Sequence, residues 1–282
     1  MCKRKLIVPT STRWNSFYDA LSCITDIPSP ELNSLCSSLG IKSLTEREYI
    51  FLKEYCTVMK PLTVALDILQ GEDNCYYGSL LPTLETLMSR TLVLRNGLSR
   101  MTAGLPDVIV EAIKTRFAPV LDSKDALLAA VTLPKFKVRW LRENERREAA
   151  KNLLLAECCA HASVLHAPVL GNKTPAASYS TVAEKEFFDF DEEENTSSFS
   201  CDTEVIEYLQ SGSEMEVLNR FPHLKKISLK LNTATPSSAP VERLFSLGGL
   251  VLTPRRNRLS DNRFERLLLM RYNHCFSGEH PQ

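Results

Sequence analysis

The stretch from Thr235 to His274 constrains the fold of this chain most, because two helices and the turn between them can be read from it. Serine and proline at 237–240 are typical of a helix start, since a serine hydroxyl accepts a free first-turn amide and proline needs no amide partner there. Apolar residues follow at helical spacing, namely Val241, Leu244 and Phe245. Gly248 and Gly249 predict the end of this first helix, because glycine tolerates the left-handed conformation of a helix stop.

A second helix is predicted to start at Ser260 or Asp261. Its apolar residues recur three and four positions apart and are Phe264, Leu267, Leu268 and Tyr272, with Leu269 and Met270 widening the apolar face. A face of this width predicts burial on more than one side.

The turn between the two helices is rich in arginine, with Arg255, Arg256 and Arg258 close together. Arginines in a tight turn suit contacts with phosphate. They suit equally well the capping of helix carbonyls or surface pairs with Asp261 or Glu265. The residues alone leave both roles open.

Glu242 lies beside the apolar stripe of the first predicted helix, within about one turn of its start. The helix dipole keeps a carboxylate there ionised, and so available to bind a metal or to pair with an arginine. Acidic residues are also ordinary in first turns, so an exposed glutamate without a special role explains the position too.

The composition is that of a globular protein, since 282 residues with 44% hydrophobic content suffice for one large domain or two modest ones. No apolar run approaches a membrane span, and the first nine residues are too short and too basic for a signal peptide, so we expect an intracellular protein with no membrane partner. Nine cysteines without a Cys-x-x-Cys pair predict free thiols.

The charges are segregated although the formal net charge is zero. Residues 235–274 contain seven arginines and three acidic residues, whereas residues 184–207 contain ten acidic residues and one lysine. This distribution can produce a basic face that attracts phosphate.

The middle of the chain is predicted to be a bundle of antiparallel helices without an enzyme site. Apolar residues recur at helical spacing over 46–69, 79–98, 108–117 and 125–133, and Pro61 is expected to kink or break the first of these helices. A short β-type run at Leu6-Ile7-Val8 comes before them, and the acidic stretch 168–203 predicts a flexible linker.

One cluster of cysteine and histidine invites a metal interpretation, with Cys158, Cys159, His161 and His166 close in sequence. Cys158 and His161 would share a helix face, but a fourth ligand at a suitable spacing is missing. The sequence therefore favours a structural role for these residues, and we predict no metal site.

Several stretches resemble transposases of the hAT superfamily, among them Phe-Pro-His-Leu at 221–224. The strongest is 236–273, which contains Val-Glu-Arg-Leu-Phe-Ser at 241–246 and Arg-Arg-Asn-Arg-Leu-Ser at 255–260. Two more are Thr-Arg-Trp-Asn-Ser at 12–16 and a partial match at 128–137. The likeness runs over almost the whole chain, but only over the back half of such a transposase.

The resemblance implies roles for individual residues. The C-terminal region is the dimerisation segment of the family, which implies dimerisation through Leu244, Phe245, Phe264, Leu267, Leu268 and Tyr272. Glu242 stands where the family has the last of three acidic residues that hold divalent metal ions in a ribonuclease-H-like nuclease. Arg13 and Trp14 stand where the family has residues implicated in stacking on an unpaired base at the transposon end.

We therefore expect a mainly α fold, with a helical bundle-like domain attached to an incomplete ribonuclease-H-like α/β core that keeps only its last strand and C-terminal helices. The expected parts are a core remnant at 1–27, a helical insertion domain at 45–167, an acidic linker at 168–203 and a C-terminal dimerisation region at 204–274.

The resemblance also bears on catalysis, because the other two catalytic carboxylates of the family lie upstream of the Thr-Arg-Trp-Asn-Ser string and only thirteen residues precede Trp14. Two-metal chemistry requires several converging carboxylates. We expect a protein that is not an enzyme and has no cofactor or small-molecule substrate, with Mg²⁺ or Mn²⁺ bound only if upstream carboxylates complete the site.

The expected function is dimerisation in the nucleus, with a second copy or a related hAT-like protein as partner. Two alternatives stay open. The chain could be a subunit or fragment of an active transposase that performs metal-dependent DNA strand transfer, or a non-catalytic remnant that binds DNA through Arg255, Arg256 and Arg258.

Overall fold

The computed structural model describes residues 6–10, 15–71, 75–165, 201–254 and 258–273. Over these residues the protein is mainly helical, as predicted. The chain divides into two compact units, the first formed by residues 1–123 with 234–282 and the second by residues 124–233. None of the helices within the described ranges combines the length and the apolar composition that a bilayer span requires.

The predicted strand at Leu6-Ile7-Val8 is wrong, because these three exposed residues have no regular structure. A strand needs a neighbour to pair its backbone N–H and C=O groups. No strand is formed anywhere in the described part of the chain, so a β-type run of three residues finds no partner there. The sheet of the expected ribonuclease-H-like core is accordingly not seen in these residues.

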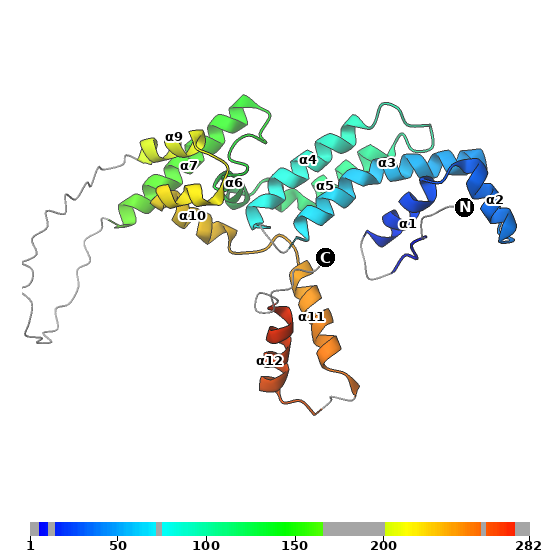
Figure 1. Cartoon of the computed structure of the whole chain (residues 1–282). Coiled ribbons are helices and arrows are strands. Elements are labelled where there is room, and N and C mark those ends of the chain that lie inside the picture. The colour runs from blue at the N-terminus through cyan, green and yellow to red at the C-terminus, as the bar shows by residue number, and fades with distance from the viewer. Residues whose placement is uncertain (1–5, 11–14, 72–74, 166–200, 255–257, 274–282) are drawn as a thin grey trace, which may run out of the picture. The chain divides into compact units, whose positions relative to one another are not determined.

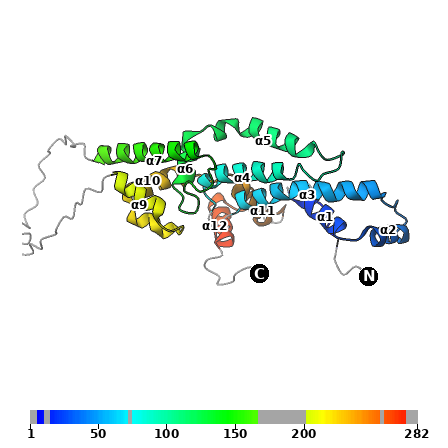
Figure 2. The same ribbon diagram turned by 90° about the horizontal axis from the view of Figure 1, so that it is seen from above.

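The first unit consists of helices from both ends of the chain. They are α1 (Ser16–Thr25), α2 (Ser29–Ser38), α3 (Glu46–Leu69), the 3₁₀ turn η1 (Tyr77–Ser79), α4 (Leu80–Val93), α5 (Leu105–Leu121), α11 (Ala239–Val251) and α12 (Asp261–Tyr272). α3, α4 and α5 lie side by side in both Figure 1 and Figure 2. Their shared core contains Ala65, Leu80, Leu84, Leu87 and Ile113.

α3 has the bounds that its periodicity predicts. It begins with a capping box, in which the Thr45 hydroxyl accepts the Glu48 amide at 3.3 Å and the Glu48 carboxylate accepts the Thr45 amide at 2.8 Å. Pro61 lies inside α3 and does not break it. The Tyr49 hydroxyl donates to the Ile27 carbonyl at 2.6 Å, which attaches the α1–α2 connection to α3.

The second unit has the most deeply buried core of the molecule. Its helices are α6 (Lys124–Val131), α7 (Asn144–Leu165), α9 (Cys201–Gln210), the 3₁₀ turn η2 (Met215–Arg220) and α10 (Pro222–Asn232). α7 buries Ala150, Leu154 and Cys158, which are spaced four apart on one face. The buried Tyr208 hydroxyl of α9 donates to the Val131 carbonyl at 3.0 Å, so α9 is joined to α6 by a specific polar contact.

Candidate dimerisation surface and acidic cleft

α11 and α12 form a hairpin of two helices packed against each other, as the sequence predicts (Figure 1). α12 begins at Asp261, with Ser260 as its N-cap residue, at the predicted position. α11 begins at Ala239 and carries Pro240 in its first turn. The side chain of Ser237 donates to the Leu69 carbonyl at 2.8 Å, which joins the start of this hairpin to the end of α3.

The predicted helix stop at Gly248 and Gly249 is wrong, because α11 continues through both glycines to Val251. Neither glycine has the positive φ of a helix stop. Gly248 instead allows close packing: a Cβ added there would lie 3.3 Å from Cζ of Phe264 in α12. The glycine therefore serves the contact between the two helices rather than the end of the first.

The hairpin buries very little of its apolar surface within the chain. α12 has no buried residue over its fully described length, and α11 buries only Gly248 and Val251. Of the residues predicted to mediate dimerisation, Leu244, Phe264 and Leu268 are half-buried. The other three, Phe245, Leu267 and Tyr272, are exposed.

We define the C-terminal apolar surface as the set of exposed apolar side chains of the hairpin, which are Val241, Phe245, Leu250, Leu252, Leu267, Leu269, Met270 and Tyr272. Val241 and Phe245 lie four apart on α11, and Leu267 and Met270 lie three apart on α12, so the members of each pair are neighbours on their helix. Phe245 is 75% exposed and Met270 is 77% exposed. Large apolar side chains this exposed commonly mark an interaction surface.

A cleft of about 680 Å³ lies beside α11 in the first unit and includes Glu242. Asp19 of α1 and Asp67 of α3 line the same cleft. Each of two carboxylates has a neutral partner: Asp67 accepts the side-chain amide of Asn15 at 2.8 Å, and Glu242 accepts the Ser238 hydroxyl at 2.8 Å. Sequence reasoning missed this grouping, because the three acidic residues come from helices far apart in the chain.

The three carboxylates of this cleft share it without converging. Among the described residues, the only set of three Cys, His, Asp or Glu ligand atoms within 4.8 Å of one another is Cys158, Glu204 and His223. Two-metal phosphoryl transfer needs several carboxylates around ions about 4 Å apart. The carboxylates around Glu242 lie farther apart than two-metal chemistry requires.

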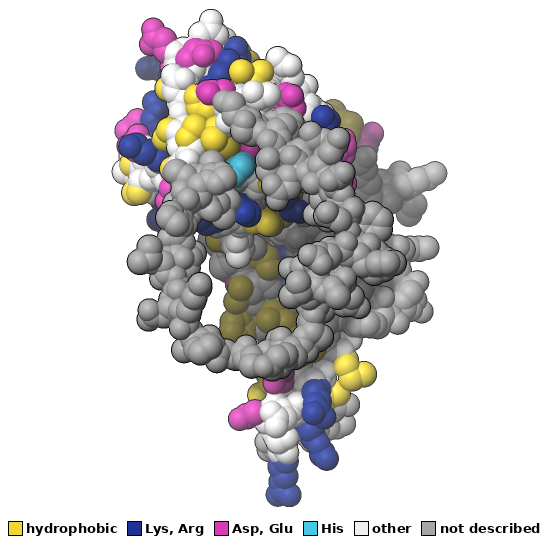
Figure 3. Space-filling view, turned by 90° about the vertical axis from the view of Figure 1, so that its left-hand side faces the viewer, with side chains coloured by type: hydrophobic (Ala, Val, Ile, Leu, Met, Phe, Trp, Pro, Cys, Tyr) yellow, Lys and Arg dark blue, Asp and Glu magenta, His cyan; other side chains and the backbone are white. Residues whose placement is uncertain are grey.

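Of the five residues predicted to contact nucleic acid, the structure describes one. Arg13, Trp14, Arg255 and Arg256 lie outside the described residues. Arg258 is described and exposed, next to the start of α12. Lys and Arg side chains are visible at the lower end of the molecule in Figure 3.

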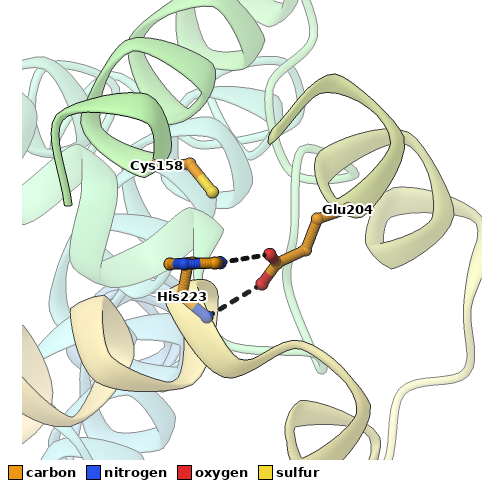
Figure 4. A group of neighbouring side chains, drawn as sticks. All are labelled: Cys158, Glu204 and His223. Atoms are coloured by element: carbon orange, nitrogen blue, oxygen red, sulfur yellow. Dashed lines mark hydrogen bonds and ion pairs between the residues drawn. The ribbon is translucent and has the colours of Figure 1, made fainter. Parts of the chain in front are cut away.

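The second unit contains a buried polar cluster formed by Cys158 of α7, Glu204 of α9 and His223 of α10 (Figure 4). Glu204 accepts the backbone amides of His223 and Leu224 at 3.0 and 3.1 Å, and its second oxygen lies 2.7 Å from His223 Nδ1. Burial raises the pKa of the Cys158 thiol, with a further contribution from the nearby Glu204 and Cys201. His161 Nε2 lies 3.5 Å from Oε1 of Glu157 on the same helix.

Residues 183–274 match the family model of the hAT family C-terminal dimerisation region. Residues 183–274 therefore resemble the C-terminal dimerisation region of hAT transposases. A comparison with curated proteins finds no match. The matched hAT region contains α9 and α10 of the second unit together with the α11–α12 hairpin of the first.

Proposed function

We propose that this hAT transposase-derived protein acts by dimerisation, with the C-terminal apolar surface of one copy covered by the same surface of a second copy. One observation carries the proposal: the exposed apolar residues of α11 and α12 lie within the matched dimerisation region. Burial of apolar surface is the main driving force of most protein association. A surface that pairs with itself also fits the two-fold symmetry of most homodimers.

The same proposal includes the absence of catalysis at Glu242. Its support is the spacing of the acidic groups, since Asp19 and Asp67 line the cleft of Glu242 without forming a close ligand group with it. A ribonuclease-H-like origin of α11 and α12 and a nuclear location follow from the family alone and belong to this proposal. Mg²⁺-dependent cleavage of a transposon-end duplex that disappears in Glu242→Gln would overturn the non-catalytic part.

The test of dimerisation is the dissociation constant of the purified full chain, measured by analytical ultracentrifugation over a dilution series. Leu267→Asp places a charge on the proposed interface, and we expect it to weaken the dimer at least about 30-fold, as expected for a central interface residue. Leu267 is the better choice than Leu268, because Leu268 is half-buried and its substitution would also disturb the contact between α11 and α12.

The matched control is Val108→Asp in α5, which also places a charge on an exposed apolar residue but lies outside the hAT region. This variant should dimerise as the wild type does. A wild-type chain that stays monomeric at all concentrations, or equal weakening by both variants, would contradict the proposal. Dimerisation of Leu267→Asp only when mixed with a related hAT protein would point to that protein as the partner.

A second candidate function, contact with DNA, is favoured by exposed arginines of the hairpin. Arg258 and Arg263 are exposed on either side of the start of α12. If they contact phosphates, binding to a DNA duplex falls with salt, and Arg258→Ala with Arg263→Ala reduces the magnitude of the salt slope by about 2. An unchanged slope in the double variant would exclude this role for the two arginines.

A further inference from the structure

The second unit places three metal-binding types of side chain at one point of its core. Cys158 comes from the buried face of α7, Glu204 from the first turn of α9 and His223 from the first turn of α10. One ligand atom from each lies within 4.8 Å of the other two. Figure 4 shows the Cys158 sulfur pointing toward the pair formed by Glu204 and His223.

Burial makes this cluster different from a surface group of charges. Cys158 and Glu204 are almost fully buried, and Cys158 belongs to the hydrophobic core of the unit. Glu204 uses one oxygen to accept the amides of His223 and Leu224, as a cap for α10. Its other oxygen lies 2.7 Å from Nδ1 of the His223 imidazole. That second oxygen, the imidazole and the thiol are the groups that converge.

We infer that Cys158, Glu204 and His223 bind a zinc ion, which connects α7, α9 and α10. Thiolate, imidazole and carboxylate are the three ligand types of protein zinc sites. With zinc–ligand bonds of about 2.0–2.3 Å, two ligands of one tetrahedral ion lie roughly 3.3–3.8 Å apart. The separations in the cluster, up to 4.8 Å, need only side-chain adjustment to reach that spacing.

The surrounding contacts favour such a site. The capping bonds to α10 fix one oxygen of Glu204 and so orient the other toward the His223 imidazole, in the way that outer contacts orient metal ligands. Three protein ligands leave the fourth position of a tetrahedral zinc ion for a water molecule. Binding releases the thiol proton of Cys158, because the thiolate is the ligand.

The test uses the purified full chain, metal-depleted and then titrated with Zn²⁺ or with Co²⁺ as a spectroscopic substitute. We expect one equivalent of ion, and for Co²⁺ a thiolate-to-metal charge-transfer absorption. Cys158→Ala should remove that absorption and weaken zinc binding by more than about 100-fold, since loss of even an outer-shell contact costs about 10–100-fold. Bound zinc should also raise the midpoint of thermal unfolding.

The matched control is Cys159→Ala, which removes an exposed thiol one residue away on the same helix and should leave both signals unchanged. Glu204→Gln is the second variant, because it keeps an oxygen that can cap α10 and removes the carboxylate. It should lose zinc affinity while keeping the helical circular dichroism of the wild type. No charge-transfer absorption in the wild type, or an unchanged absorption in Cys158→Ala, would overturn the inference.

Discussion

The two halves of the hAT region, α9 with α10 and α11 with α12, differ in how far their apolar side chains are buried. α9 and α10 bury most of theirs in the core of the second unit, where Tyr208, Leu224 and Ile227 are almost inaccessible, and expose Ile206 and Leu229. α11 and α12 leave theirs outside, with Phe245 and Met270 largely exposed. Both halves belong to one family segment, so the description "dimerisation region" covers two physically different parts.

The difference indicates which half is available to a partner. A residue already surrounded by its own chain gains nothing further from association, whereas an exposed apolar side chain gains about 25 cal/mol per Å² when a partner covers it. The half formed by α9 and α10 therefore stabilises the second unit, and the half formed by α11 and α12 is the one suited to bind a partner chain.

The largest expected effect comes from a pair of alanine substitutions, one in each half. Leu224→Ala removes a fully buried side chain of α10 and should lower the free energy of unfolding of the second unit by about 2–5 kcal/mol. Met270→Ala removes an exposed side chain of α12 and should change the stability of the dilute monomer by less than about 0.5 kcal/mol. Urea denaturation with hydrogen exchange assigns each change to its unit.

The same pair of variants also tests whether α10 and α12 differ in burial. At concentrations where the wild type is a dimer, Met270→Ala should weaken association while Leu224→Ala affects mainly unfolding. A loss of monomer stability from Met270→Ala as large as that from Leu224→Ala would mean that α12 is buried within its own chain. The C-terminal apolar surface would then not be an open interface.

The helices themselves could be predicted because their signals are local. α3 has the predicted bounds of 46 and 69, and α12 begins where Ser260 and Asp261 indicated. Apolar spacing reports the face of a helix that is buried, but not what buries it. The width of the apolar face on α12 predicted burial on more than one side, whereas among the described residues of α12 only Phe264 and Leu268 are half-buried.

The parts that could not be predicted depend on contacts between distant residues. Cys158 was considered together with His161, its neighbour in sequence, but its spatial neighbours are Glu204 and His223 from other helices. Asp19 and Asp67 share a cleft with Glu242 although nothing in their local sequence links them. Gly248 looked like a helix stop because the close approach of Phe264 is visible only in the folded hairpin.

The smallest expected effect is a difference in helix stability between alanine substitutions at the two adjacent glycines of α11, Gly248 and Gly249. Gly249→Ala adds a Cβ with nothing within 4 Å, so it should stabilise α11 by up to about 1 kcal/mol through helix propensity alone. Hydrogen-exchange protection of the peptide amides in 239–251 should rise by a factor of up to about 5. Gly249→Ala therefore measures the effect of helix propensity alone, because the added Cβ contacts no other residue.

Gly248→Ala has the same gain in propensity, but its Cβ would lie 3.3 Å from Cζ of Phe264, so the ring must move by a few tenths of an ångström. We expect less protection than in Gly249→Ala, and the difference measures the contact between α11 and α12. In a background with Phe264→Leu the crowding is relieved, so the two alanine variants should become equal, as a double-mutant cycle can show. Equal protection already in the wild-type background would mean that α12 does not pack on α11 at Gly248, and the hairpin that presents the apolar surface would lose its support.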